Sequence, residues 1–170
     1  MKSVLIFILS LLISAEAFCQ QSSAITREVK KTAKEFRSEG WKTISGSESL
    51  ESQIADLFHV RESVTPDASD KIIGSRSAVG VDYASARKHA LAMAKADLAG
   101  QLESRVSSLY ESVMSTEEGR QSSSSSSKVF VEECVRETQT VMELYRTLPD
   151  GKVEVYVSLS CDISQIGSLK

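Results

Sequence analysis

The residue types that most often transfer protons or bind metals are sparse in this chain. There are two histidines, His59 and His89, and Asp56, His59 and Glu62 recur at intervals of three residues. Such spacing would place the three side chains on one side of a helix. A metal site needs convergent ligands and usually more of them. The spacing therefore favours an ordinary polar helix face over a metal centre, and a non-catalytic role for both histidines.

The motifs of the common enzyme and cofactor classes are missing from the sequence. It contains no H-E-x-x-H, C-x-x-C or G-x-S-x-G pattern, no G-x-x-x-x-G-K phosphate-binding loop and no G-x-G-x-x-G fingerprint. Carboxylate pairs stay open, because acid and base partners meet in space rather than in sequence. We expect a protein that is not an enzyme and that has no cofactor and no metal.

The cysteines raise two separate questions. Cys134 and Cys161 would form one disulfide bridge if they are adjacent and the compartment is oxidising. The simpler alternative is that both are small buried hydrophobic side chains. The remaining cysteine, Cys19, is a candidate for lipidation because it lies at the end of an apolar leader.

That leader predicts a secretory signal peptide over residues 1–19. A short positive start precedes a run of ten residues that is apolar except for Ser10, and small residues follow. Cleavage before Phe18 or before Gln20 fits this pattern, whereas the large Phe18 disfavours lipidation of Cys19. No other stretch is as apolar, so the mature chain is predicted to have no transmembrane segment. We expect an exported protein that is periplasmic, outer-membrane-associated or secreted.

Charge and the first predicted helix bear on partners. The net charge is −3 with both signs interspersed, which does not indicate nucleic acid as a partner. Apolar residues at helical spacing predict a helix over 23–39 that ends at Gly40. Trp41 then covers the helix end or fills the core, and its role as an exposed ligand platform is the alternative. The helix also carries a basic stripe that consists of Arg27, Lys30, Lys31 and Lys34. This stripe could lie on an anionic membrane surface, although interleaved glutamates favour a solvated face with local ion pairs.

The rest of the chain predicts an α+β domain. A second helix contains Leu50 to Phe58, with Ser47 as its N-cap, and a strand covers 71–81. An alanine-rich helix over 83–114 has the strongest periodicity, and a six-serine run at 122–127 precedes a short helix. The chain then forms a hairpin around Pro149-Asp150-Gly151, whose strands are expected to share one apolar face.

These elements predict a small antiparallel sheet, made of a strand and a C-terminal hairpin, packed on one long helix. Two additional helices precede this unit in the sequence. We therefore divide the chain into a signal peptide at 1–19, a helical segment at 20–66 and a strand–helix–hairpin domain at 67–170.

Segments 73–77, 84–90 and 94–99 together resemble the twenty-kilodalton lipoprotein family of Gram-negative envelopes. The shared texture is a strand followed by a long alanine-rich helix, as in Ala84-Ser85-Ala86-Arg87 and Ala94-Lys95-Ala96-Asp97-Leu98-Ala99. A related domain occurs in a flagellar assembly protein, and Gly40-Trp41-Lys42 further resembles uncharacterised exported proteins. The resemblance implies an envelope location and an α+β fold, and it brings no catalytic residues. The chain departs from the lipoproteins at Phe18.

Three functions remain in view, and an enzyme is the least favoured of them. The first is a structural or protein-interaction role in the envelope, with another envelope protein or the membrane surface as partner. The second is a ligand-binding module in which Trp41, Tyr83 and Tyr145 line a cleft.

Overall fold

The computed structural model describes residues 25–62, 71–113 and 128–164, with side chains up to residue 108 in the second of these ranges. The predicted signal peptide, Cys19 and the serine run lie outside the described residues. Within the described part of the chain, no helix has both the length and the apolar character needed to cross a membrane.

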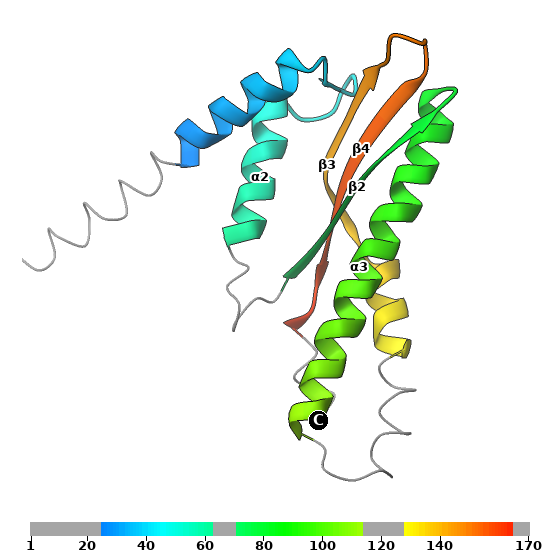
Figure 1. Cartoon of the computed structure of the whole chain (residues 1–170). Coiled ribbons are helices and arrows are strands. Elements are labelled where there is room, and N and C mark those ends of the chain that lie inside the picture. The colour runs from blue at the N-terminus through cyan, green and yellow to red at the C-terminus, as the bar shows by residue number, and fades with distance from the viewer. Residues whose placement is uncertain (1–24, 63–70, 114–127, 165–170) are drawn as a thin grey trace, which may run out of the picture.

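The described residues form an antiparallel sheet with helices on both faces, which confirms the predicted α+β fold. The strands are β1 (Lys42–Thr43), β2 (Lys71–Gly80), β3 (Gln139–Thr147) and β4 (Val153–Asp162), in the order β1-β3-β4-β2. The helices are 25–38, α2 (Leu50–Glu62), α3 (Tyr83–Val113) and 128–136. Figure 1 shows helix 25–38 and α2 on one side of the sheet and the long α3 on the other.

The contact between α3 and the sheet is close because both surfaces carry small residues. Ala86, Ala90 and Ala94 are spaced four residues apart, so they share one face of the helix, and all three are fully buried against β2 and β4. Gly74 and Gly80 of β2 face this stripe directly. Further along the same face, larger residues complete the core as the helix continues: Leu98, Leu102 and Val106.

A second core lies on the opposite face of the sheet, under the N-terminal helices. Val29 and Ala33 of helix 25–38 and Ile54 of α2 are buried there against Met142 and Leu144 of β3. The predicted helix over 23–39 is therefore confirmed within the described residues, with Gly40 at a positive φ of 84° just beyond its end. Only glycine adopts such a φ without strain, so Gly40 ends the helix as predicted.

The hairpin departs from the expectation of one shared apolar face. Leu144 pairs with Tyr156 and therefore lies on the same face as it, whereas Val155 and Val157 lie on the other face under α3. The turn fixes this register, since Leu148 and Lys152 close it by a backbone hydrogen bond of 2.8 Å. The apolar residues of β3 and β4 consequently serve opposite cores.

The N-cap of α2 also differs from the expectation. The Oγ atom of Ser49 accepts a hydrogen bond from the backbone N–H of Ser52 at 3.1 Å, which makes Ser49 the capping residue. Ser47, the predicted cap, instead donates to the carbonyl oxygen of Ile44 at 2.7 Å. Both serines lie just before the first residue of α2, so the local sequence did not indicate which of them caps the helix.

Two side-chain amides and one carboxylate form hydrogen bonds with backbone groups at the two margins of the sheet. Beyond the short β1, the N–H of Glu143 in β3 donates to Oε1 of Gln53 at 2.9 Å. At the β2 margin, Gln101 donates to the carbonyl oxygen of Ile73 at 3.0 Å, and the N–H of Ser75 donates to Asp97 at 3.2 Å. Backbone groups that would otherwise be open to another strand are therefore satisfied within the chain.

Replacing Gln53 by alanine is expected to lower the free energy of unfolding by about 1.5 kcal/mol, because it leaves the buried N–H of Glu143 without its acceptor. Chemical denaturation monitored by circular dichroism measures this loss. The control is Gln139→Ala, which changes an exposed side chain at the start of β3, and we expect a change within about 0.5 kcal/mol. Equal effects of the two substitutions would contradict the capping role of Gln53.

Candidate functional site

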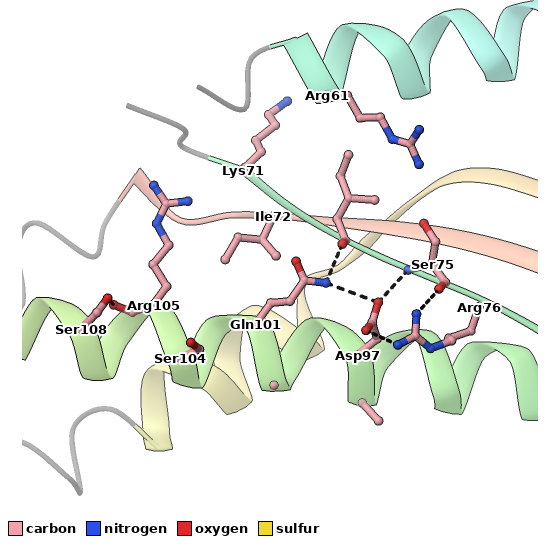
Figure 2. Close-up of a pocket in the computed structure, with 13 residues that line it drawn as sticks. Arg61, Lys71, Ile72, Ser75, Arg76, Asp97, Gln101, Ser104, Arg105 and Ser108 are labelled. Carbon is pink, nitrogen blue, oxygen red and sulfur yellow. Dashed lines mark hydrogen bonds and ion pairs between the residues drawn. The ribbon is translucent and has the colours of Figure 1, made fainter. Parts of the chain in front are cut away.

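A groove lies between α2, β2 and α3, and Figure 2 shows its lining. Its volume is about 900 Å³. We call it the basic groove and define it by its polar lining residues: Arg61, Lys71, Ser75, Arg76, Asp97, Gln101, Ser104, Arg105 and Ser108.

The polar side chains of α3 reach the groove because of their spacing. Asp97, Gln101 and Arg105 recur every four residues, so they form one stripe along the helix. This stripe lies beside the buried stripe that contains Leu98 and Leu102. The helix therefore packs its apolar face on the sheet and presents the adjacent polar face beside the margin of β2.

The floor of the groove is a fixed hydrogen-bonded network. The carboxylate of Asp97 accepts from the backbone N–H of Ser75 at 3.2 Å and from Nη2 of Arg76 at 2.5 Å. Gln101 donates both to Asp97 at 3.3 Å and to the carbonyl oxygen of Ile73. Arg76 also donates to the carbonyl oxygen of Ser75 at 2.9 Å (Figure 2). Because Asp97 is fully engaged in this network, it acts as a structural acceptor.

The charge around the groove is strongly one-sided. Among the described residues, four basic side chains line it, from Arg61, Lys71, Arg76 and Arg105, whereas Asp97 is the one acidic side chain of this described lining. The whole chain has a net charge of −3. Among the described residues, neither Arg61 nor Arg105 forms an ion pair within 4.0 Å. Guanidinium groups and serine hydroxyls together can donate several hydrogen bonds to one anion.

Trp41, a predicted interaction residue, lies in the second core and is 7 % exposed. Its ring contacts Phe36 and Tyr156 edge-on, with centroids 6.3 and 6.2 Å away, and Arg146 covers it at 4.5 Å from the ring centroid. The indole N–H donates to Glu39 at 3.2 Å. Trp41 therefore joins helix 25–38 to the sheet, in agreement with the expectation that it fills the core.

The predicted basic stripe lies elsewhere on the surface. Its four residues are all exposed on helix 25–38, whose inner face contributes Val29 and Ala33 to the second core: Arg27, Lys30, Lys31 and Lys34. Within the described residues, the ion pair of this helix is made by Arg37, which contacts Glu51 of α2 at 2.5 Å. The stripe and Trp41 thus lie on different sides of the helix and do not form one surface.

Tyr83 and Tyr145 belong to the α3 side of the sheet. Their rings meet edge-on with centroids 5.9 Å apart, and Trp41 lies on the opposite side. The structure therefore does not bring the three aromatic residues together in one cleft. The hydroxyl of Tyr83 instead donates to the buried Glu143, and burial together with this hydrogen bond raises the pKa of Tyr83 to about 12.

Glu143 is held from a second direction by Arg87. Nε of Arg87 donates to Oε1 at 2.6 Å and Nη2 donates to Oε2 at 3.2 Å, so the pair is bidentate. The hydrogen bond to Glu143 raises the pKa of Arg87 despite the opposing effect of burial. This cluster ties the start of α3 to the middle of β3, and three hydrogen-bond donors converge on its carboxylate.

The two histidines lie on helices that cover opposite sides of the sheet. His59 on α2 and His89 on α3 are both exposed, and the described residues contain no group of three or more metal-binding side chains that could hold an ion. Asp56 is also exposed; partial burial and the nearby Glu48 raise its pKa. The side chain of Glu62 lies outside the described residues.

Cys134 and Cys161 are brought together by the fold. Cys134 lies on helix 128–136 and Cys161 on β4, and both thiols are buried in the core under α3. Both donate toward the carbonyl oxygen of Asp162. The sequence placed these residues on a helix and a strand, and the packing of the helix against β4 makes them neighbours.

The basic groove was missed from the sequence because its residues come from three separate elements. A partial signal exists in the polar spacing of Asp97, Gln101 and Arg105 beside the apolar stripe of α3. Arg61 and Arg76 carry no comparable signal, since single arginines on a helix and a strand are usually solvated surface residues.

No known protein-family model matches the chain, and no curated protein matches its sequence.

Proposed function

We propose that this chain is a non-catalytic, exported envelope protein that binds anionic groups in the basic groove. The observation that carries the proposal is that two cations of the groove, Arg61 and Arg105, form no ion pair within 4.0 Å among the described residues. A bound anion reduces the electrostatic repulsion between the positive charges of the groove. The proposed ligand group is a phosphate, sulfate or carboxylate on a larger envelope molecule.

The dimensions and chemistry of the groove support this class of ligand. Its volume of about 900 Å³ lies within the range of about 300–1,000 Å³ that small-molecule sites occupy. Arginine, lysine and serine donors dominate its polar lining, whereas a site for an apolar ligand would be lined by aliphatic and aromatic side chains. The network around Asp97 holds the floor in place before any ligand arrives.

The proposal predicts that Arg61→Gln combined with Arg105→Gln weakens phosphate binding about thirtyfold, because each lost charge-assisted hydrogen bond contributes on the order of 1 kcal/mol at a partly exposed site. The measurement is a titration of amide chemical shifts with inorganic phosphate, against sodium chloride at equal ionic strength. We expect the shifts to centre on residues 71–76 and 97–108. Arg76 is left intact because it holds Asp97.

The matched control is Arg27→Gln combined with Lys30→Gln, which removes the same charge from exposed positions on helix 25–38. This variant should bind phosphate as the unchanged chain does. Equal weakening in both variants, or phosphate shifts spread evenly over all exposed lysines, would contradict a specific groove. Vesicles of phosphatidylcholine with and without phosphatidylglycerol then distinguish a lipid headgroup from a free anion as the source of the phosphate.

The exposed basic stripe favours a second candidate function, which is attachment to an anionic membrane surface through helix 25–38. Its four cations are all exposed and form no ion pair among the described residues. Under this alternative, Arg27→Gln with Lys30→Gln abolishes binding to vesicles that contain phosphatidylglycerol, while the groove variant retains it. Measuring both variants with both vesicle compositions therefore separates the two functions.

The envelope location in this proposal comes from the predicted signal peptide and from the resemblance to the twenty-kilodalton lipoproteins. Amino-terminal sequencing of the mature protein from soluble and membrane fractions tests it. A free terminus near Phe18 or Gln20 supports export as a soluble protein, and a blocked Cys19 with an added lipid mass supports an anchored one. An intact Met1 in both fractions would remove this part of the proposal.

A further inference from the structure

The two cysteines under α3 occupy positions that fit a covalent link between two elements. Helix 128–136 contributes Cys134, and β4 contributes Cys161 close to its end. Cys134 is 6 % exposed and Cys161 is 4 % exposed, and both belong to the same buried cluster. Their sulfur atoms lie 3.9 and 3.4 Å from one shared atom, the carbonyl oxygen of Asp162.

The surroundings of this pair are those of an interior site. Val131 on the same helix and Ile163 beyond β4 are also buried in this cluster. The shared carbonyl oxygen of Asp162 makes the two sulfur atoms neighbours in this interior. A disulfide joins Cβ atoms that are about 3.5–4.5 Å apart, so two neighbouring thiols reach that geometry by side-chain rotation and a small movement of the short helix.

We propose that Cys134 and Cys161 form an intramolecular disulfide that fastens helix 128–136 to β4. One cysteine thiolate attacks a donor disulfide and releases one donor thiol, and the other cysteine then displaces the second donor thiol from the mixed disulfide. The two cysteines lose two protons and two electrons in total, and the donor disulfide is reduced to two thiols. The donor is a small-molecule or protein disulfide of an oxidising compartment.

The folded environment determines when this reaction occurs. Burial raises the pKa of both thiols, that of Cys161 to about 12, so the thiolate that attacks a disulfide is scarce near neutral pH once the core has closed. The bridge therefore forms during folding, before helix 128–136 docks on β4. Once it is buried, the same exclusion of solvent protects it from external thiols.

The bridge has a structural consequence for the flank of α3 next to helix 128–136. A second groove of about 560 Å³ lies there, lined in part by Arg87, Lys95, Arg136 and Thr138. Arg136 belongs to the helix that the disulfide would fasten. Oxidation thus fixes one wall of this groove, and reduction frees it to move.

The test is refolding of the full-length chain carrying Cys19→Ser from denaturant, in a buffer of reduced and oxidised glutathione. Trypsin then separates the two remaining cysteines into peptides 129–136 and 153–170. We expect these peptides joined in the non-reduced digest of the monomer, with both cysteines protected from alkylation in denaturant. The bridge closes a loop of about 27 residues, so the melting temperature should fall by roughly 10 °C on reduction.

Cys134→Ala combined with Cys161→Ala is the control, because alanine keeps both positions small and apolar. Its melting temperature should not respond to reductant, which excludes a general effect of the reducing agent. The proposal is overturned if both cysteines remain open to alkylation in denaturant after oxidative refolding, or if the linked peptides appear only in a dimer. Neither outcome depends on anion binding, so this test is independent of the proposed function.

Discussion

Replacing Gly74 by alanine is expected to lower the free energy of unfolding by about 3 kcal/mol. A Cβ atom at this position would lie 2.8 Å from Cβ of Leu98 and 2.9 Å from its backbone nitrogen, and closer still to the carbonyl oxygen of Ala94. The nearest neighbours are backbone atoms of α3, so a side-chain rotation does not relieve the contact. The helix must move away from β2.

Gly100→Ala is the matched control for this substitution. Gly100 lies on α3, the helix that packs against Gly74, and nothing lies within 4 Å of the Cβ that alanine would add. Alanine has the higher helix propensity, so this variant should gain about 0.5–1 kcal/mol. Urea denaturation of both variants gives the two free energies. A loss at Gly74 below about 1 kcal/mol would show that α3 is not seated against β2 as closely as the structure describes.

Replacing Arg87 by methionine is expected to destabilise the protein by about 2 kcal/mol, because Glu143 then keeps a buried charge without its cationic partner. The carboxylate of Glu143 is 11 % exposed. Arg87 is 42 % exposed, and solvent around it screens part of the interaction, which places the loss below that of a fully buried pair. Thermal or urea denaturation measures the change. Lys88→Met, one residue further along α3 and exposed, should change stability by less than about 0.5 kcal/mol.

The double substitution Arg87→Met with Glu143→Met separates the two parts of this effect. If the loss at Arg87 comes from an uncompensated buried charge, removing the charge as well should recover a large part of it. A double variant as unstable as the sum of the two single variants would instead show that Arg87 contributes mainly by packing of its side chain on the sheet.

Much of the fold follows from local patterns in the sequence. The alternation and turn residues around Pro149-Asp150-Gly151 predicted the hairpin, and Gly151 does adopt a positive φ of 82°. The apolar periodicity predicted the long helix that the structure describes as Tyr83–Val113, and Asp82 caps its start by accepting a hydrogen bond from the N–H of Ser85 at 2.7 Å. Period and capping are properties of neighbouring residues, so sequence alone can reveal them.

The assignment of faces was less accessible. Met142 and Val157 each belong to an apolar alternation, yet they serve opposite cores, because the turn sets the register between their strands and a bulge interrupts β3 between Thr140 and Met142. A shift of one residue moves a side chain to the other face. The sequence pattern gives the alternation but not its phase relative to the partner strand.

The candidate site was the least accessible of all. Arg61 and Arg105 are 44 positions apart, and they line one groove because α2 and α3 both lie beside β2. No short-range pattern encodes that arrangement. By contrast, Trp41 was placed in the core from its local context, since the only tryptophan of the chain directly after an amphipathic helix is usually part of the core.

The strand order has a consequence for how the protein is made. β4 is the last described strand in the sequence, yet it lies between β2 and β3 and pairs with both of them. During synthesis, β4 leaves the ribosome after β2 and β3, so neither of these two strands can pair with it earlier. Their long-range pairing is among the slow steps of folding. A chain with this order cannot close its sheet until β4 has been synthesised, which favours an extended polypeptide for the proposed export.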